Sequence, residues 1–117
     1  MEKFAYTGES FLAGIKNDRW RIGILRYGER FSKFGEMERH MTSDEAFILL
    51  SGSATLYEID EHDNAVECVM EQNTVYNIKA GVWHHIVVSR DATVAVIENN
   101  DVSMQNTQRV YKEVSSC

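Results

Sequence analysis

The sequence predicts an all-β fold of the sandwich or barrel type, in one domain. About eight short segments rich in β-branched and aromatic residues follow one another, and turn residues separate them at the spacing typical of such folds. The chain of 117 residues contains no proline, and we find no repeat, low-complexity tract or linker in it. A single domain spanning residues 1–117 is therefore expected, and it is long enough to bury a core without a disulfide or a structural metal.

Strands are expected where apolar segments lie between turn residues. They fall near residues 20–27, 36–42, 45–50, 54–59, 65–70, 74–81, 84–89 and 93–98. The Ser-Gly-Ser sequence at 51–53 predicts a hairpin between two of these strands. The Asp-Asn pair at 63–64 and the Arg-Asp pair at 90–91 mark two further turns.

The two ends of the chain are less regular. The opening segment from Gly8 to Lys16 could be a short helix. The tail after Asn99 is polar, and it could contain one late strand, around Arg109 to Val114, that pairs back onto a sheet edge.

The segment from Ala46 to Leu50 is apolar at every position. In a strand, Phe47 and Leu49 face one way, and the residues between them face the other. A strand with one solvated face alternates more cleanly. We therefore expect the core to cover one face, and a second sheet, the N-terminal segment or another subunit to cover the other. The last option predicts a homodimer.

Composition and charge narrow the range of partners and compartments. The net charge is −6, whereas nucleic acids and anionic membranes need a basic face, so neither is an expected partner. The N-terminus lacks the apolar region of a signal peptide, and no stretch approaches the roughly 20 apolar residues of a membrane span. The two cysteines, Cys68 and Cys117, need not pair. These features favour a reduced, cytoplasmic protein. They leave a small polar ligand or substrate open as the partner, because the local charge of a pocket can differ from the total charge.

Four residues stand at spacings that suit a site. Glu38 and His40 are two apart, so they point to the same face of their strand. Glu45 opens the next strand and can point back to the same place. Of the adjacent pair His84 and His85, a regular strand turns only one inward. Imidazoles and carboxylates together are suitable ligands for a divalent metal.

These residues carry a resemblance to the cupin superfamily. The series Glu38-x-His40-x4-Glu45-x6-Gly52 resembles the first cupin motif, Gly-x5-His-x-His, three or four residues, Glu, x6, Gly. The segment Lys79-x-Gly81-x2-His84 resembles part of the second, Gly-x5-Pro-x-Gly-x2-His-x3-Asn. The resemblance covers roughly residues 30–98. It implies a small single-domain cupin, a jelly-roll β-barrel with one internal site. In metal-binding cupins these positions hold one divalent metal, which implies as ligands the quartet Glu38, His40, Glu45 and His84.

The chain departs from the motifs at several positions. Glu38 replaces the first histidine, and Ser32, Asn73, Lys79 and Val88 replace the glycines, the proline and the asparagine. Two imidazoles with two carboxylates still suit zinc, manganese, iron or nickel. Phosphomannose-isomerase-type cupins have a glutamine, another oxygen ligand, at the position of Glu38.

Several residues admit a second interpretation. The quartet could line the wet cavity of a cupin without metal. His85 could donate a hydrogen bond to a ligand, but a surface or subunit contact is the simpler expectation, and His62 is expected in solvent. Trp83 and Phe47 could line a pocket or pack in the core. The residues Trp20, Arg21, Arg26 and Tyr27 could frame the mouth of the barrel and hold an anionic substrate, or belong to an edge strand.

Three functions are compatible with such a site. The first is a metal-dependent enzyme of the sugar isomerase or epimerase type, or of the dioxygenase type, with Glu45 or Glu38 as a ligand or as the base. The second is a non-catalytic cupin that binds a small ligand without metal. The third is a metal-free lyase or isomerase that uses acid–base groups such as His84 and Glu45.

Overall fold

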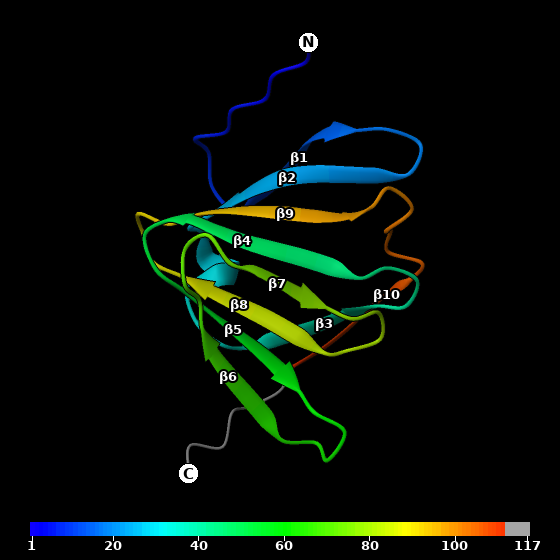
Figure 1. The fold of residues 1–117 in the computed structure, drawn as a ribbon. Helices are drawn as coiled ribbons and strands as arrows, with labels where there is room; N and C mark the ends of the chain where they lie inside the picture. The colour runs from blue at the N-terminus through cyan, green and yellow to red at the C-terminus, as the bar shows by residue number, and fades with distance from the viewer. Residues whose placement is uncertain (112–117) are drawn as a thin grey trace.

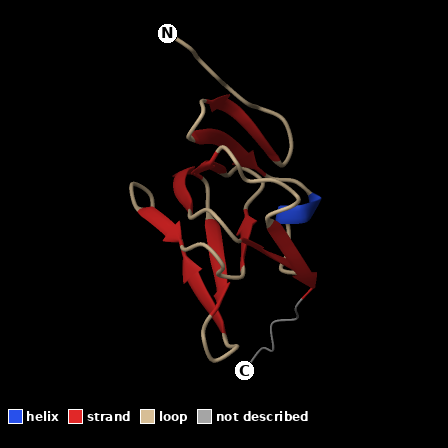
Figure 2. Cartoon of the chain, turned by 90° about the vertical axis from the view of Figure 1, so that its right-hand side faces the viewer, coloured by secondary structure: helices blue, strands red, loops and turns tan. Residues whose placement is uncertain are grey.

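The computed structural model describes residues 1–111, and these form two five-stranded antiparallel sheets that face each other (Figures 1 and 2). One sheet has the strand order β1-β2-β9-β4-β7 and the other β10-β3-β8-β5-β6. The elements in chain order are β1 (Phe11–Lys16), β2 (Trp20–Arg26), the 3-10 turn η1 (Glu29–Phe31), β3 (Glu36–His40), β4 (Glu45–Ser51), β5 (Ala54–Ile59), β6 (Ala65–Val69), β7 (Val75–Ile78), β8 (His84–Val88), β9 (Thr93–Asn99) and β10 (Thr107–Tyr111).

All eight predicted strands are present, but the prediction of a helix at Gly8 to Lys16 is wrong. This segment contains β1, which pairs with β2 and extends the sheet by one strand. Phe11 packs against the core, and this burial outweighs the weak helical tendency of a short segment. The predicted late strand corresponds to β10, which pairs antiparallel with β3. The part of that prediction beyond residue 111 lies outside the described residues.

The predicted hairpin at residues 51–53 is wrong, because this turn carries the chain from one sheet to the other. β4 pairs with β7 and β9, whereas β5 pairs with β6 and β8. Gly52 has φ +74°, and a Cβ there would lie 2.6 Å from the Cα of Ala92. The Ser53 amide donates to the Ser89 hydroxyl at 3.0 Å, and the Ser89 amide donates to the Ser53 carbonyl at 2.9 Å. The two crossings between the sheets are thus bound to each other.

The core lies between the inner faces of the two sheets. On β4, Phe47 and Leu49 are buried there, as the sequence predicts, while Leu50 remains 52% exposed. The outer face of β4 is therefore not covered at Leu50 by the second sheet or by the N-terminal segment, although the Phe4 ring of that segment lies against Gly14 of β1. Among residues 1–111, no helix has the length and apolar character needed to cross a membrane.

Candidate metal centre

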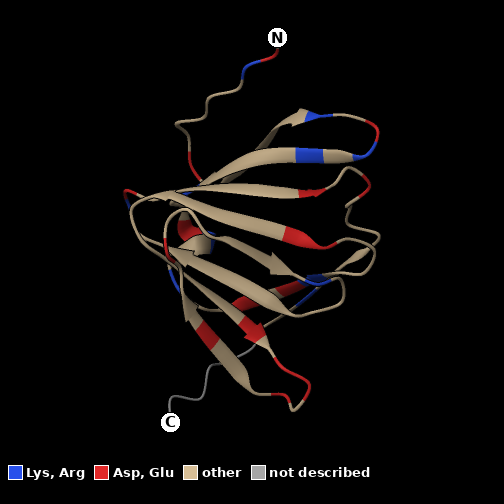
Figure 3. Ribbon diagram, viewed as in Figure 1, with Lys and Arg blue, Asp and Glu red and all other residues tan. Residues whose placement is uncertain are grey.

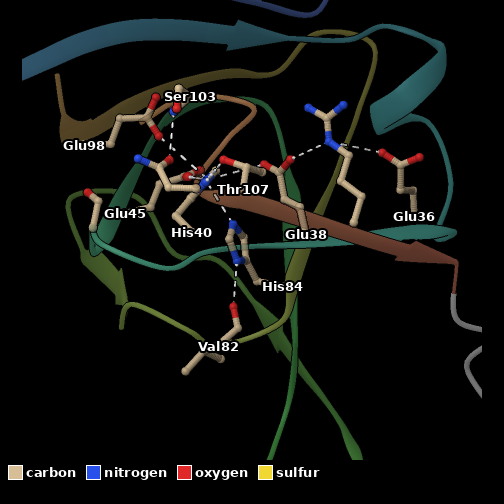
Figure 4. A network of polar contacts seen from close by, with 12 residues as sticks. Glu36, Glu38, His40, Glu45, Val82, His84, Glu98, Ser103 and Thr107 are labelled. Atoms are coloured by element: carbon tan, nitrogen blue, oxygen red, sulfur yellow. Dashed lines mark hydrogen bonds and ion pairs between the residues drawn. The ribbon is translucent and has the colours of Figure 1, made fainter. Parts of the chain in front are cut away.

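Three strands bring the quartet together inside the molecule, at one end of the core (Figure 4). Glu38 and His40 come from β3, Glu45 from the first position of β4 and His84 from the first position of β8. β3 and β8 pair in register at Glu38 and His84. One potential ligand atom from each of the four side chains lies within 4.8 Å of all the others. The sequence spacing that suggested one site therefore corresponds to one place in the fold.

Hydrogen bonds on the far side of each imidazole fix its orientation. Nδ1 of His84 lies 3.1 Å from the Val82 carbonyl and donates to it, so that Nε2 faces the other quartet members. Nδ1 of His40 lies 2.9 Å from the Thr107 hydroxyl. Partners of this kind orient imidazoles that bind metals.

The atoms that face the centre lack ordinary partners. Within the described part of the chain, Nε2 of His40, Nε2 of His84 and Oε2 of Glu45 are buried without a hydrogen bond. His40 and Glu45 form a close ion pair, but its geometry is not that of a hydrogen bond. Buried polar atoms without partners are costly and uncommon. A divalent cation bound by the quartet would satisfy all three, so the donor set fits a metal of the type that the resemblance implies.

The electrostatics of the quartet favour positive charge at its centre. Burial would raise the pKa of Glu38, but the nearby imidazole of His40 and the guanidinium of Arg30 hold the pKa well below the usual range. Against the effect of burial, the two imidazoles likewise lower the pKa of Glu45 to about 2. Burial would lower the pKa of His40, but Glu38 and Glu45 raise it to about 10. Glu45 similarly outweighs burial and raises the pKa of His84.

A further carboxylate, Glu98, lies beside the quartet and was not predicted. It is directly opposite Glu45 on the neighbouring strand β9 and opposite Arg21 on β2, and Figure 3 shows these acidic and basic segments side by side. Nε and Nη2 of Arg21 lie 2.8 and 2.7 Å from one Glu98 oxygen, and the other oxygen is 3.8 Å from Nε2 of His40. Burial, followed by the charge of Glu45, raises the pKa of Glu98 to about 7.

The remaining predicted residues divide between the interior and the surface. The expectation of a surface position for His85 is wrong: the residue is 4% exposed, its ring contacts Phe31 and Phe34, and its Nε2 lies 3.1 Å from the Lys33 carbonyl. Its burial lowers its pKa. The chain segment from η1 to Phe34 therefore covers His85, which lines the same cavity as the quartet.

The aromatic residues considered for the pocket wall or the barrel mouth also lie in different parts of the structure. Phe47 belongs to both the core and the site, with its ring edge toward His84 at 6.0 Å between centroids. Trp83 stacks with Arg39 instead, 4.4 Å from the guanidinium to the ring centroid. Trp20 is 46% exposed.

The four remaining residues have mixed outcomes. Arg26 donates to the Thr7 and Gly8 carbonyls, and Tyr27 contacts Arg90. His62 is in solvent as predicted, with a side chain that is 75% exposed. Arg21 alone of the four candidates for the barrel mouth lines the cavity.

A cavity of about 410 Å³ contains the quartet and Glu98. This volume is within the range of small-molecule sites. Its other walls combine apolar side chains with three arginines. They include Phe11, Leu25, Phe31, Phe47, Ile86, Val96, Val102, Met104, Arg21, Arg30 and Arg109.

Comparison with known proteins supports the fold. No family model matches the chain, and no curated protein matches its sequence. Among solved structures, Pac13, a nucleoside dehydratase, is similar with a TM-score of 0.66 and 14% identity over 97% of this chain and 95% of that one. A Streptomyces Pac13 variant with uridine has a TM-score of 0.66 and 16% identity, over 97% and 87% of the two chains.

A second protein with the same fold is much longer than this chain. Oxalate decarboxylase from Bacillus subtilis has a TM-score of 0.60 and 16% identity over 80% of this chain, which matches only 24% of the decarboxylase chain. At such identities the likeness concerns the fold alone. The cupin-type jelly roll that the motifs predicted is thereby confirmed.

Proposed function

We propose that this chain is a metal-dependent enzyme that acts on a small polar molecule, with one divalent cation held by the quartet. The observation that carries the proposal is the set of three buried ligand atoms, on His40, His84 and Glu45, that converge without hydrogen-bond partners among the described residues. They converge inside a cavity large enough for a small molecule. Buried titratable groups in such a cavity are typical of functional sites.

The ligand set suits a metal of intermediate hardness. Two imidazole nitrogens and two carboxylate oxygens are compatible with zinc, manganese, iron or nickel, and the two carboxylates shift the preference toward the harder ions. One of the solved structures with the same fold concerns the Mn(II) centres of oxalate decarboxylase. We therefore expect the preference for zinc over manganese and iron to be smaller than at a site with three histidines.

The residues around the quartet favour a proton shift over an oxygenase reaction. When bound, a divalent cation would polarise an oxygen of the substrate as a Lewis acid. Glu98 adds a carboxylate that the quartet does not need, fixed by Arg21 at the edge of the quartet. The carboxylate of Glu45, or alternatively that of Glu38, provides a second proton acceptor inside the cavity. Glu98 and Glu45 come from one sheet and Glu38 from the other, so the chain offers carboxylate acceptors on two sides of the centre, as an isomerase or epimerase requires.

Deuterium exchange tests the reaction type without knowledge of the natural substrate. The metal-loaded protein is incubated in heavy water with a panel of aldoses, ketoses and keto acids, and proton NMR follows the signals of carbons beside the carbonyl. We expect metal-dependent loss of such a signal for at least one compound. Oxygen consumption without exchange would indicate the dioxygenase alternative. The absence of both would contradict an enzymatic role and favour a binding protein.

A metal-free lyase or isomerase is the second candidate. One observation favours it: Nε2 of His84 lies 3.7 Å from Oε1 of Glu45 in a buried ion pair, which is an acid–base pair inside the cavity. A protein of similar fold, Pac13, is a nucleoside dehydratase. Full exchange or elimination activity after complete removal of metal would favour this candidate over the first.

The outer face of the sheet that contains β4 supports a homodimer. It carries exposed apolar side chains on four of its strands, with exposed fractions of 47% for Leu12, 46% for Trp20, 52% for Leu50 and 62% for Val75. Continuous apolar patches on a folded surface usually mark an interface. We expect a particle of twice the 13.4 kDa chain mass in light scattering. A Leu50→Glu, Val75→Glu variant should be monomeric, and a monomeric parent would contradict the dimer.

A further inference from the structure

Three arginines line the cavity of a protein whose total charge is −6. Arg21 comes from β2, Arg30 from η1 and Arg109 from β10, so three separate elements contribute an arginine to the cavity wall. Arg21 is bound to Glu98 through two of its nitrogens. Arg30 and Arg109 lie on the other side of the quartet, next to Glu38.

The charges of the cavity wall depend on the metal. Its three arginines are matched by three glutamates, Glu38, Glu45 and Glu98. With neutral imidazoles these formal charges cancel, so a bound divalent cation leaves two positive charges in excess. An excess of positive charge in a partly enclosed cavity attracts anions. The wall of the loaded site is therefore suited to an anionic substrate although the protein as a whole is acidic.

The two arginines beside Glu38 share a single oxygen of its carboxylate. Nη2 of Arg30 and Nε of Arg109 lie 2.6 and 3.3 Å from Oε2 of Glu38, while Oε1 faces Nε2 of His40 at 3.5 Å. Glu38 can thus turn one oxygen to a metal and the other to the arginines. The neighbouring Glu36 is more distant, 3.9 Å from Arg30 and 3.5 Å from Arg109.

The arginines keep donors that Glu38 does not use. A guanidinium has five N–H donors in a planar fork, and Nε of Arg30 is buried without a hydrogen-bond partner among the described residues. The side chains of Arg30 and Arg109 are 35% and 48% exposed, so they stand at the rim and remain accessible. Paired guanidinium groups bind carboxylate and phosphate by parallel hydrogen bonds.

We propose that the substrate of this site carries a carboxylate or phosphate group, which Arg30 and Arg109 bind at the rim while another polar atom of the molecule reaches the quartet. Only the contact between the substrate and the quartet rests on the proposed function, because the contact with the two arginines does not require a metal. Phe31, whose ring lies 5.4 Å from the Arg30 guanidinium, and Val102 line the same cavity, which suits a short carbon chain between the two ends of the substrate.

Calorimetric titration with matched probes tests this inference. Succinate is compared with succinamide, and glycerol 3-phosphate with glycerol, on the manganese-loaded protein and on the metal-depleted protein. We expect one anionic probe to bind at least about tenfold more tightly than its neutral counterpart, as charge-assisted hydrogen bonds imply. The stronger of the two anionic probes distinguishes a carboxylate from a phosphate substrate.

Variants identify the groups responsible. Arg30→Gln, Arg109→Gln should lose the preference for anions and keep its metal, and Arg109→Gln alone, at an exposed position, should lose part of it. Arg90→Gln is the control. Arg90 lies just before β9, whereas Glu98, which lines the cavity, lies near the other end of that strand. This variant should therefore bind anions as the parent protein does. Metal content is measured on every variant, so that loss of the metal is not mistaken for loss of the anion contact.

The outcomes separate the two proposals. Anion preference that depends on Arg30 and Arg109 supports this inference, even if the protein retains no metal and the proposed function fails. Equal binding of charged and neutral probes overturns it, as does an unchanged preference in the double variant. A metal-loaded protein that binds neither succinate nor glycerol 3-phosphate also overturns it and leaves the metal centre standing.

Discussion

Replacement of both histidines in His40→Ala, His84→Ala is expected to abolish the binding of about one divalent metal per chain. Both imidazoles direct a buried Nε2 to the centre, and both are fixed by a hydrogen bond to Nδ1. Loss of two nitrogens would leave only the carboxylates of Glu38 and Glu45, which hold transition metals weakly. Metal content is measured on protein purified without an affinity tag, after incubation with manganese, iron, nickel or zinc.

Thermal unfolding gives a second readout of the same metal. A ligand that binds only the folded state stabilises it, by about 2.7 kcal/mol at a free concentration one hundred times Kd. The melting temperature of the parent should rise on addition of metal, and that of the double variant should not. His62→Ala is the matched control, because His62 is an exposed histidine in the β5–β6 turn. It should keep the metal and the stabilisation.

Two results would count against the metal centre. The first is a parent that retains no metal from any of the four ions. The second is a double variant that is folded by circular dichroism and still holds one equivalent. If the double variant does not fold, His84→Ala alone answers the question, because it leaves the ion pair of His40 with Glu45 in place.

The motif spacing predicted which quartet residues lie together where they are close in the sequence. Glu38 and His40 share a strand face, and Glu45 follows after a short turn, so their proximity depends on few residues. His84 required a long-range pairing, which the Gly81-x2-His84 turn signals within the cupin resemblance. The structure brings all four together. Their role as ligands is the part of the prediction that the metal measurement tests.

Features that depend on strand register could not be predicted. Glu98 has no motif of its own, and it reaches the site because β9 pairs with both β4 and β2. Its only sequence signal is its place at the end of an apolar strand. The turn at Gly52 has the local signature of a hairpin, because a glycine with positive φ suits both a hairpin and a crossing between sheets. Non-local pairing alone decides between them.

Truncation of the core below the site should have the largest effect on stability. Phe47 is 1% exposed, in the middle of β4, and it is one of the largest fully buried side chains among the described residues. Phe47→Ala leaves a cavity and should lower the free energy of unfolding by about 3–5 kcal/mol. A domain of this kind is stable by only about 5–15 kcal/mol. Urea unfolding of the metal-free protein, followed by circular dichroism, measures the loss.

The same substitution should also lower the affinity for metal, because the Phe47 ring packs edge-on against the His84 ring. Phe47→Leu restores much of the buried volume, so we expect it to recover most of the stability. The surface control is Val69→Thr, at a position on β6 that is 67% exposed, where the change should stay within about 0.5 kcal/mol. A Phe47→Ala protein as stable as this control would contradict the position of Phe47 in the core. If Phe47→Ala lost stability but kept the parent's metal affinity, the orientation of His84 would not depend on Phe47.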